Sequence, residues 1–449
     1  MGRMGMLTLN IRPERPALDV LAEPQVCYLL VTARATGGAG PSPVSWALVA
    51  DASRSMRIPI VDEQVFRELV QAGGAQETLV DGVPVWQLAG EVPASVRAAA
   101  PSALSYVARA LHTVVEQLDA NDRFALVACA EEAALLTPVA SGADRAQLVR
   151  GIELLPETNL GERTDLARGL ALALGELRAT RDARRAERIV LLTDGFSERA
   201  DACLALAETA AAERVTISTV GLGGEFQETL LTALADRSGG RAIFLRSPDE
   251  IPRAVAAELA AARAVAVRGV TLRVTPAPGV QLRRVTRIRP ALAVLHEPAE
   301  RRAPAEGALG DLAPGAEVSL LLELVTEPRP AGIAPLATCA LLQPAGPVAQ
   351  AEIVAAYRSG PPLLLPAVRE AAARANIARL QRQAAEQSGN PREAARLLRA
   401  AAARLDDLGE HGLAQLAREQ AASVEHTGRL TGLATKELAY ATRRLGGGP

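Results

Sequence analysis

The 449-residue chain has few of the residues that build disulfide scaffolds, zinc sites or aromatic binding surfaces. Aromatic residues make up only 2 %, and there are four cysteines and four histidines. The cysteines lie far apart without a Cys-x-x-Cys motif, which argues against a disulfide scaffold or a zinc site. Cys129 lies in an apolar run and is expected to pack as a small core residue.

The chain also lacks an excess of positive charge, since 49 Lys+Arg oppose 51 Asp+Glu and give a net charge of -2. A nucleic-acid-binding surface usually needs a basic excess and stacking aromatics, so no nucleic-acid partner is expected. No apolar run is long enough for a secretory signal or a membrane span. The sequence therefore predicts no membrane span and a cytoplasmic location.

What the chain does contain is ample apolar material, 49 % of all residues, and enough length for two or three domains. We expect residues 1–40 to form extended segments that pair with 266–358 in an antiparallel β-sandwich. Residues 41–265 would be inserted between them, and 359–449 would form a C-terminal α-helical domain.

Residues 41–265 alternate between apolar runs and helical stretches. This alternation predicts an α/β fold: a Rossmann-like, doubly wound and mostly parallel sheet with helices on both faces. Ligands bind such sheets at the carboxyl ends of the strands. The predicted strands are 44–50, 123–128, 188–192, 215–220 and 242–245.

A long insertion at 57–99 separates the first predicted strand from its helix. It contains a helix-like piece at 62–70 and a predicted hairpin at 77–88, with Asp81-Gly82 at its turn. Long ordered insertions beside a ligand-binding edge are more often functional than ornamental.

Asp51, Ser53 and Ser55 follow the first predicted strand at alternate positions. In a loop that turns at the strand end, their oxygens can converge on one point. Hard cations such as Mg²⁺ prefer oxygen ligands. Ser and Asp also favour turns and helix caps for purely local reasons, so this spacing alone is a weak indication.

Two further residues are expected at the same edge of the sheet. Thr164 follows a polar loop at the start of a predicted helix, and Asp194 follows the third buried strand. Taken singly, Thr164 could be an N-cap and Asp194 a turn carboxylate. Their order and strand context together favour a shared cation site over coincidence.

The order Asp-x-Ser-x-Ser, then Thr-Asp-Leu-x-x-Gly-Leu, then Thr-Asp-Gly resembles the von Willebrand factor A (VWA) domain and its metal-ion-dependent adhesion site (MIDAS), in a bacterial multidomain protein. The likeness covers about residues 44–263. It implies that Ser53 and Ser55 bind the cation directly, Thr164 directly or through water, and Asp51 and Asp194 mainly through waters. Mg²⁺ is the expected ion, with Mn²⁺ and Ca²⁺ as alternatives, and an Asp or Glu of another protein would complete its coordination.

Three details qualify this resemblance. The family commonly has Gly where Arg54 stands, so the Arg54 side chain either projects toward the partner or packs away from it. Thr158 is a rival to Thr164, which we prefer because the Leu-x-x-x-Leu helix pattern follows it. The insertion at 57–99 would give a contact surface different from that of adhesion receptors.

We weigh three functions. The leading hypothesis is a non-enzymatic protein–protein interaction module, an intracellular adaptor or assembly factor that by family analogy works beside an ATPase or a chaperone. The second is a Mg²⁺-dependent phosphoester hydrolase with Asp51 as nucleophile, which is disfavoured because residue 53 is not acidic and no lysine occurs from 44 to 265. The third is a helical scaffold with a vestigial metal site.

Overall fold

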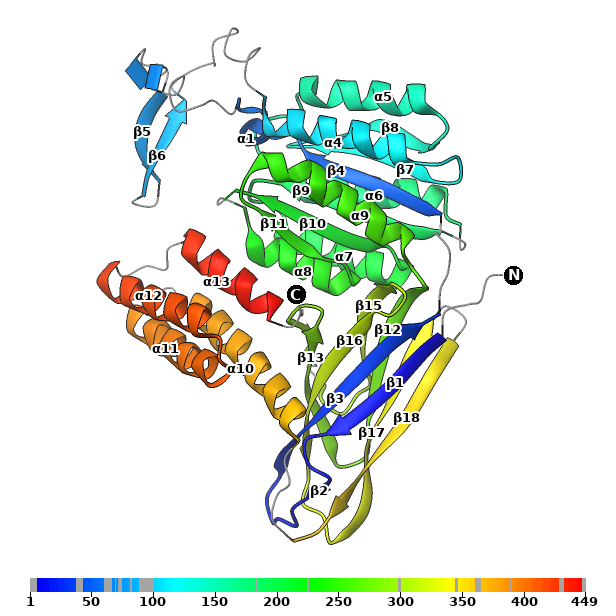
Figure 1. Ribbon diagram of the computed structural model, residues 1–449, viewed down its shortest axis with the longest axis vertical. Coiled ribbons are helices and arrows are strands. Elements are labelled where there is room, and N and C mark those ends of the chain that lie inside the picture. Colours follow the sequence, from blue (N-terminus) through cyan, green and yellow to red (C-terminus); the bar gives the residue numbers. More distant parts are fainter. Residues whose placement is uncertain are drawn as a thin grey trace.

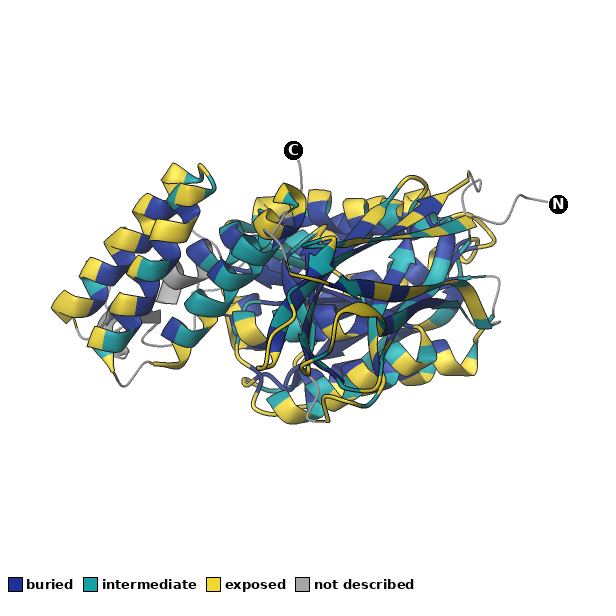
Figure 2. Cartoon of the chain, turned by 90° about the horizontal axis from the view of Figure 1, so that it is seen from below, coloured by how far each residue is buried: buried dark blue, intermediate teal, exposed yellow. Residues whose placement is uncertain are grey.

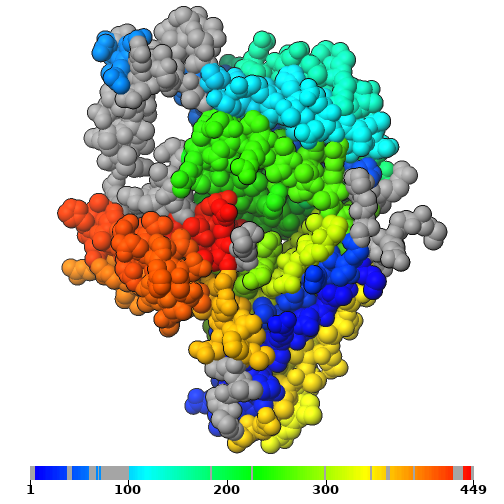
Figure 3. Space-filling model, viewed as in Figure 1, coloured from blue at the N-terminus to red at the C-terminus, as the bar shows by residue number. Residues whose placement is uncertain are grey.

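The structure is a computed structural model in which three units can be distinguished: an α/β domain, a β-sandwich and a set of C-terminal helices (Figure 1). In Figure 3 the α/β domain is mainly cyan and green, the sandwich combines blue with yellow, and the C-terminal helices are orange and red. The residues described are 6–37, 43–59, 67–68, 70–71, 75–80, 83–88, 101–182, 185–223, 226–297, 300–343, 346–359, 365–387, 390–427 and 432–445.

A six-stranded sheet forms the centre of the α/β domain. Its strands are parallel except the last, which runs antiparallel to its neighbour. In spatial order they are β11 (Ala242–Leu245), β10 (Thr216–Leu222), β9 (Ala186–Thr193), β4 (Val44–Asp51), β7 (Arg123–Cys129) and β8 (Ala133–Ser141).

Helices cover both faces of this sheet. Side chains alternate along each strand, and because most residues of the buried strands are apolar, both faces are apolar and need covering. In β4, Trp46 and Leu48 belong to one core and Ala47 and Val49 to the other. The first core includes α4 (Ala103–Gln117), α5 (Arg145–Leu154) and α9 (Ile251–Arg263); the second includes α6 (Leu166–Ala179), α7 (Ala200–Glu213) and α8 (Glu228–Ser238). The predicted doubly wound α/β class is confirmed.

Strand β8 was not among the predicted strands. It lies at the edge of the sheet, is mostly half-buried and contains the exposed Pro138, so it has neither a continuous apolar run nor a clean alternation. Proline is tolerated at a sheet edge because it need not donate a hydrogen bond there. A second difference concerns Thr164, which precedes α6 instead of opening it, since that helix begins at Leu166.

The two flanks of the α/β domain form one sandwich, which is antiparallel except for the short strand Ala17–Leu18, paired parallel to its neighbour. Strand β3 pairs with β16 along ten residues, with Val31 opposite Leu320, so the start of the chain and its later part share one sheet. The α/β domain is inserted between them. One sheet contains β1 (Met6–Pro13), β3 (Gln25–Thr36), β16 (Glu317–Thr326), β13 (Val280–Arg289) and β14 (Ala293–His296); the other contains β15 (Ala305–Leu312), β12 (Val267–Pro276), β17 (Gly332–Gln343), β18 (Gly346–Tyr357) and β2 (Ala17–Leu18).

The C-terminal helices form a separate core and rest on the sandwich through the first of them. Val368 and Ala371 of α10 pack against Leu321 and Leu292 of the sandwich. The buried residues of the remaining helices face one another, and exposed residues lie on the outside (Figure 2). These helices are α10 (Pro366–Glu386), α11 (Pro391–Asp407), α12 (His411–Thr427) and α13 (Gly432–Arg444).

The hairpin predicted in the insertion is confirmed. Strands β5 (Ala75–Val80) and β6 (Val83–Leu88) pair antiparallel, with Val80 opposite Val83. The insertion follows directly on the short helix α1 (Arg54–Arg57), and most of the helix-like piece at 62–70 lies outside the described residues.

Candidate metal-binding site

Asp51 is the buried centre of the candidate site at the carboxyl end of β4. It is completely buried, and its two carboxylate oxygens accept hydrogen bonds from different segments. The Ser53 amide donates to Oδ1 at 2.9 Å, while the hydroxyls of Thr164, at 3.3 Å, and Thr193 donate to Oδ2. The carboxylate is therefore fixed in orientation by donors from three segments: the loop after β4, the loop before α6 and the end of β9.

The remaining predicted residues lie around this carboxylate. The Ser53 and Ser55 hydroxyl oxygens are 3.2 Å apart, and the Ser55 hydroxyl donates to Asp194 Oδ1 at 2.7 Å. The carboxyl ends of parallel strands share one sheet edge, which is why residues more than a hundred positions apart meet here. The structure thus brings together all five predicted residues: Asp51, Ser53, Ser55, Thr164 and Asp194.

Burial decreases across the site from the sheet toward solvent. Ser53 is 1 % exposed and Thr164 6 % exposed, whereas Asp194 is half-buried and Ser55 exposed. A cation held among these oxygens would therefore keep one side open to water or to an incoming ligand. Thr158 does not belong to this arrangement, because its hydroxyl donates to the Leu154 carbonyl at the end of α5, at 2.7 Å.

The two carboxyl groups of the site both have raised pKa values, which a nearby positive charge would lower. Burial raises the pKa of Asp51, although hydrogen bonds from Thr193, Ser53 and Thr164 oppose that shift. Burial, with a contribution from the neighbouring Asp51 charge, raises the pKa of Asp194 to about 7. A divalent cation would favour the charged form of both, since an opposite charge a few ångströms away stabilises a carboxylate.

Glycines make room for the site, and sequence reasoning did not single them out. A Cβ on Gly195 would lie 3.2 Å from Thr164 Oγ1 and 3.9 Å from Asp51 Oδ2, so any side chain there would enter the oxygen cluster. A Cβ on Gly169 would lie 2.7 Å from Val49 Cγ1 and 2.8 Å from Cys129 Sγ. Gly169 therefore lets α6 approach the sheet closely and positions the loop that carries Thr164.

Thr193 is a further residue that sequence reasoning left without a role. It is fully buried, donates to Asp51 and accepts a hydrogen bond from the Gly195 amide at 3.1 Å. It thus ties the end of β9 to the end of β4. The Thr-Asp-Gly motif itself was the available signal, because a hydroxyl that ends a buried strand needs a hydrogen-bond partner.

Exposed charged side chains surround the opening. The Arg54 amide donates to the Glu162 carbonyl at 3.1 Å, and its guanidinium lies 3.9 Å from the Glu162 carboxylate. Arg163 bridges Glu131 and Glu198 at 3.3 and 3.0 Å. Of the two orientations considered for Arg54, the structure has it exposed and directed to the loop before Thr164.

The donor set has the chemistry of a hard divalent cation. It consists of three hydroxyls and two carboxylates, and Mg²⁺ prefers oxygen ligands and commonly retains several waters. Within the described part of the chain, no group of three or more His, Cys, Asp or Glu side chains is arranged to hold a metal. Any cation here would consequently depend on the serine and threonine hydroxyls.

Comparison with known families and proteins agrees with this architecture. The von Willebrand factor type A domain family matches residues 97–257, and the Sll0103-like, C-terminal alpha-helical domain family matches residues 366–448. The uncharacterized protein sll0103 of Synechocystis sp. is 27 % identical over 139 residues, which are 30 % of this chain and 32 % of that relative. The match thus spans about a third of the relative's length.

Two solved structures share the fold over nearly the whole chain. The von Willebrand factor type A protein from Catenulispora acidiphila has a TM-score of 0.71 and 16 % identity, covering 99 % of this chain and 98 % of that one. The ArnB paralog VWA2 from Sulfolobus acidocaldarius has a TM-score of 0.55 and 12 % identity, with coverage of 98 % and 99 %.

The α/β unit is therefore a VWA domain by its match to that family's model. In this chain the VWA domain is inserted in a β-sandwich and followed by a Sll0103-like helical domain. Among the described residues, no helix is long and apolar enough to cross a membrane.

Proposed function

We propose that this protein binds a partner protein through a divalent cation, Mg²⁺ in the first instance, held by Ser53, Ser55 and Thr164 with Asp51 and Asp194. VWA domains generally act in protein–protein interaction, and a carboxylate of the partner would complete the coordination. The observation that carries the proposal is the chain of contacts from Thr164 through Asp51 to Ser53, Ser55 and Asp194 at the open edge of the sheet.

The charge and accessibility of the site support a role in binding. Two carboxylates can neutralise a divalent cation, and the hydroxyls complete part of its shell without adding charge. Ser55 and Asp194 lie on the open side, where a third carboxylate could reach the cation. The partner's Asp or Glu would then be recognised at this one position.

We propose further that the protein is not an enzyme and acts in the cytoplasm as an adaptor or assembly factor, beside an ATPase or a chaperone. The residue two positions after Asp51 is Ser53, whose hydroxyl lies against Ser55, so the site offers no second acid for proton transfer at that position. Hydrolysis of a generic phosphoester that requires Mg²⁺ and disappears in Asp51→Asn would overturn this part of the proposal.

Metal binding can be tested before the partner is known. We expect isothermal titration to show Mg²⁺ binding by the full chain and a loss of roughly tenfold or more in affinity for Ser53→Ala combined with Ser55→Ala. Thr209→Ala is a matched control, since this exposed hydroxyl on α7 donates to the Ala205 carbonyl of its own helix and does not contact any of the five site residues. Equal Mg²⁺ affinity in all three proteins would contradict the assignment.

Partner capture tests the second half of the proposal. We expect pulldown from native lysate to retain a partner in Mg²⁺ and to lose it in EDTA or with the Ser53/Ser55 double variant. Capture that depends only on α10 to α13 and survives EDTA would favour the helical-scaffold alternative, in which the metal site is vestigial.

A further inference from the structure

A large cleft lies where the three units of the chain meet. Its volume is about 1270 Å³, above the roughly 300–1,000 Å³ typical of small-molecule pockets. The VWA domain contributes α7 and α8, the sandwich contributes β12, β14 and β15, and the helical domain contributes α10 and α13. The cleft is distinct from the metal site, because none of the five predicted metal ligands lines it.

The cleft presents the edge of strand β14. All six consecutive residues from Leu292 to Glu297 line it, whereas β12 contributes only the alternate residues Gly269, Thr271 and Arg273. Since side chains alternate along a strand, β12 shows one face to the cleft and β14 shows its edge. Strand β14 is the last strand of its sheet and pairs with β13 alone among the described strands.

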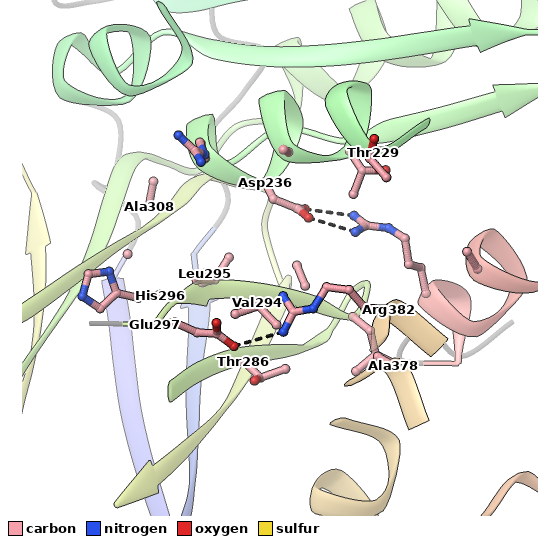
Figure 4. A pocket seen from close by; sticks show the side chains of 18 of the residues that line it. Thr229, Asp236, Thr286, Val294, Leu295, His296, Glu297, Ala308, Ala378 and Arg382 are labelled. Atoms are coloured by element: carbon pink, nitrogen blue, oxygen red, sulfur yellow. Dashed lines mark hydrogen bonds and ion pairs between the residues drawn. The ribbon is translucent and has the colours of Figure 1, made fainter. Parts of the chain in front are cut away.

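The centre of the cleft is apolar and its borders carry ion pairs. Figure 4 shows Val294 and Leu295 between the ion pair of Asp236 above and that of Glu297 with Arg382 below. The Arg382 guanidinium lies 3.0 Å from the Glu297 carboxylate. An extended segment in this cleft would have apolar contacts in the middle and charged groups on either side.

A buried ion cluster holds the three units together beside this strand. Asp236 of α8 accepts hydrogen bonds from Arg287 of β13 at 2.6 Å and from Arg443 of α13 at 2.8 and 2.9 Å. The Leu292 amide donates to the Arg443 carbonyl at 2.9 Å. The cleft is thus fixed by contacts among all three units.

The charges along the cleft favour an acidic ligand. Three lining carboxylates already pair with lining arginines: Glu208 with Arg237, Glu297 with Arg382 and Glu306 with Arg273. Asp236 is shared by two arginines, and the fifth lining carboxylate, Glu228, is one of the charges that raise the pKa of Arg443. In contrast, Arg214, at the end of α7, and Arg379, in α10, have no carboxylate partner among the described residues, and Arg379 bonds only the amides of Asn376 and Gln383.

We propose that this cleft binds an extended acidic peptide segment of another protein, which adds as a strand to the edge of β14 with its carboxylates toward Arg214 and Arg379. Strand addition gives affinity through main-chain hydrogen bonds, and the adjoining walls give specificity. Peptide binding here is independent of the cation, so this proposal does not depend on the metal site.

Fluorescence anisotropy on the full chain in EDTA tests the proposal. The probes are fluorescein-labelled peptides that alternate glutamate with valine or lysine with valine. We expect the acidic peptide to bind roughly tenfold or more tightly than the basic one, and Arg214→Glu with Arg379→Glu to remove that preference. Arg109→Glu is the control, because this arginine lies on α4 at the opposite face of the VWA sheet, stacked on Tyr106.

Two further comparisons distinguish strand addition from non-specific electrostatic binding of the peptide. N-methylation of the acidic peptide at alternate residues removes backbone donors and is expected to weaken binding by roughly tenfold.

Filling the cleft with a large side chain is the second comparison. Ala308→Trp should block the cleft and so weaken binding of the acidic peptide. Since tryptophan there could disturb β15, Thr229→Trp narrows the cleft from the exposed first turn of α8 and should weaken binding in the same direction.

Several outcomes would overturn the proposal. The first is that the acidic peptide does not bind at about 1 mM, and the second is that the basic peptide binds more tightly. The others are that N-methylation leaves the affinity of the acidic peptide unchanged, or that both tryptophan variants do. Binding that requires Mg²⁺ and survives both tryptophan variants would place the peptide at the metal site. That result would overturn the cleft assignment while leaving the metal-dependent function intact.

Discussion

The metal edge of the VWA domain and the cleft between the three units are built in different ways. The metal edge gathers short polar motifs inside one domain: two directly follow strands β4 and β9, and the third directly precedes helix α6. The cleft takes its walls from all three units and has no sequence motif of its own. A site at the ends of parallel strands can be inferred from local patterns, whereas a site between domains depends on how the domains dock.

The largest effect is expected at the metal edge itself. Asp51→Ala should lower Mg²⁺ affinity by roughly 100-fold or more, because this buried carboxylate holds the Ser53 amide and the Thr164 hydroxyl in place as well as supplying charge. Titration calorimetry measures the loss, with the exposed Asp201→Ala of α7 as control. If Asp51→Ala also lowered the affinity for the acidic peptide in EDTA by a similar factor, the metal edge and the cleft would not be independent sites.

The next effect concerns the cluster that holds the cleft together. Asp236→Ala leaves Arg287, which is 5 % exposed, buried next to a second arginine without a carboxylate. Removing one partner of a buried ion pair costs about 3–5 kcal/mol. A large fall in Tm by calorimetry is expected, together with faster proteolysis between the sandwich and the C-terminal helices.

Glu327→Ala is the matched control for Asp236→Ala, because its ion pair with Arg302 lies at the surface. Exposed pairs contribute little to stability, so its Tm should change far less. A similar fall in both variants would mean that the buried cluster does not stabilise the junction more than an ordinary surface pair.

A smaller effect tests whether helix α6 must approach the sheet closely. Gly169→Ala places a Cβ within 3 Å of Val49 and Cys129, and overpacking of this kind costs about 1–3 kcal/mol. Gly175→Ala, in the same helix, meets nothing within 4 Å and should stabilise the chain by about 0.5–1 kcal/mol through helix propensity. Thermal melts of the two variants should move in opposite directions; a shift in the same direction would contradict the packing argument.

The smallest effect is expected for Arg54→Gly. Arg54 is exposed and its ion pair with Glu162 is long, so Mg²⁺ affinity should not change measurably, and stability should fall by no more than the roughly 1 kcal/mol that glycine costs in a helix. Partner association should change by less than about tenfold, and mainly at low salt, because exposed charges act on encounter rates. Surface plasmon resonance with the captured partner at two salt concentrations measures this, and a large drop in Mg²⁺ affinity would place Arg54 in the site itself.

Local sequence patterns were sufficient to predict the metal edge, because its residues lie next to recognisable strands and helices. The continuous apolar run at 44–50 predicts a strand buried on both faces, and the polar residues after it must then lie at the sheet edge. The same reasoning placed Asp194 at this sheet edge, and the structure adds that it accepts a 2.7 Å hydrogen bond from Ser55 there. It included Thr193 and Gly195 in the Thr-Asp-Gly motif without giving them a role, since their contacts with Asp51 and Thr164 are visible only in the structure.

By itself, the sequence determined the α/β class, the alternation of buried parallel strands with helices in residues 41–265, and the residues whose oxygens gather at the carboxyl edge. Periodicity and strand-end chemistry act over a few residues, which makes them visible in one dimension. Only the tertiary structure decided that β8 closes the sheet edge, that Arg287 and Arg443 share Asp236, and that β14 borders a cleft. Those features depend on the docking of surfaces far apart in the chain, for which no local spacing of residues provides a signal.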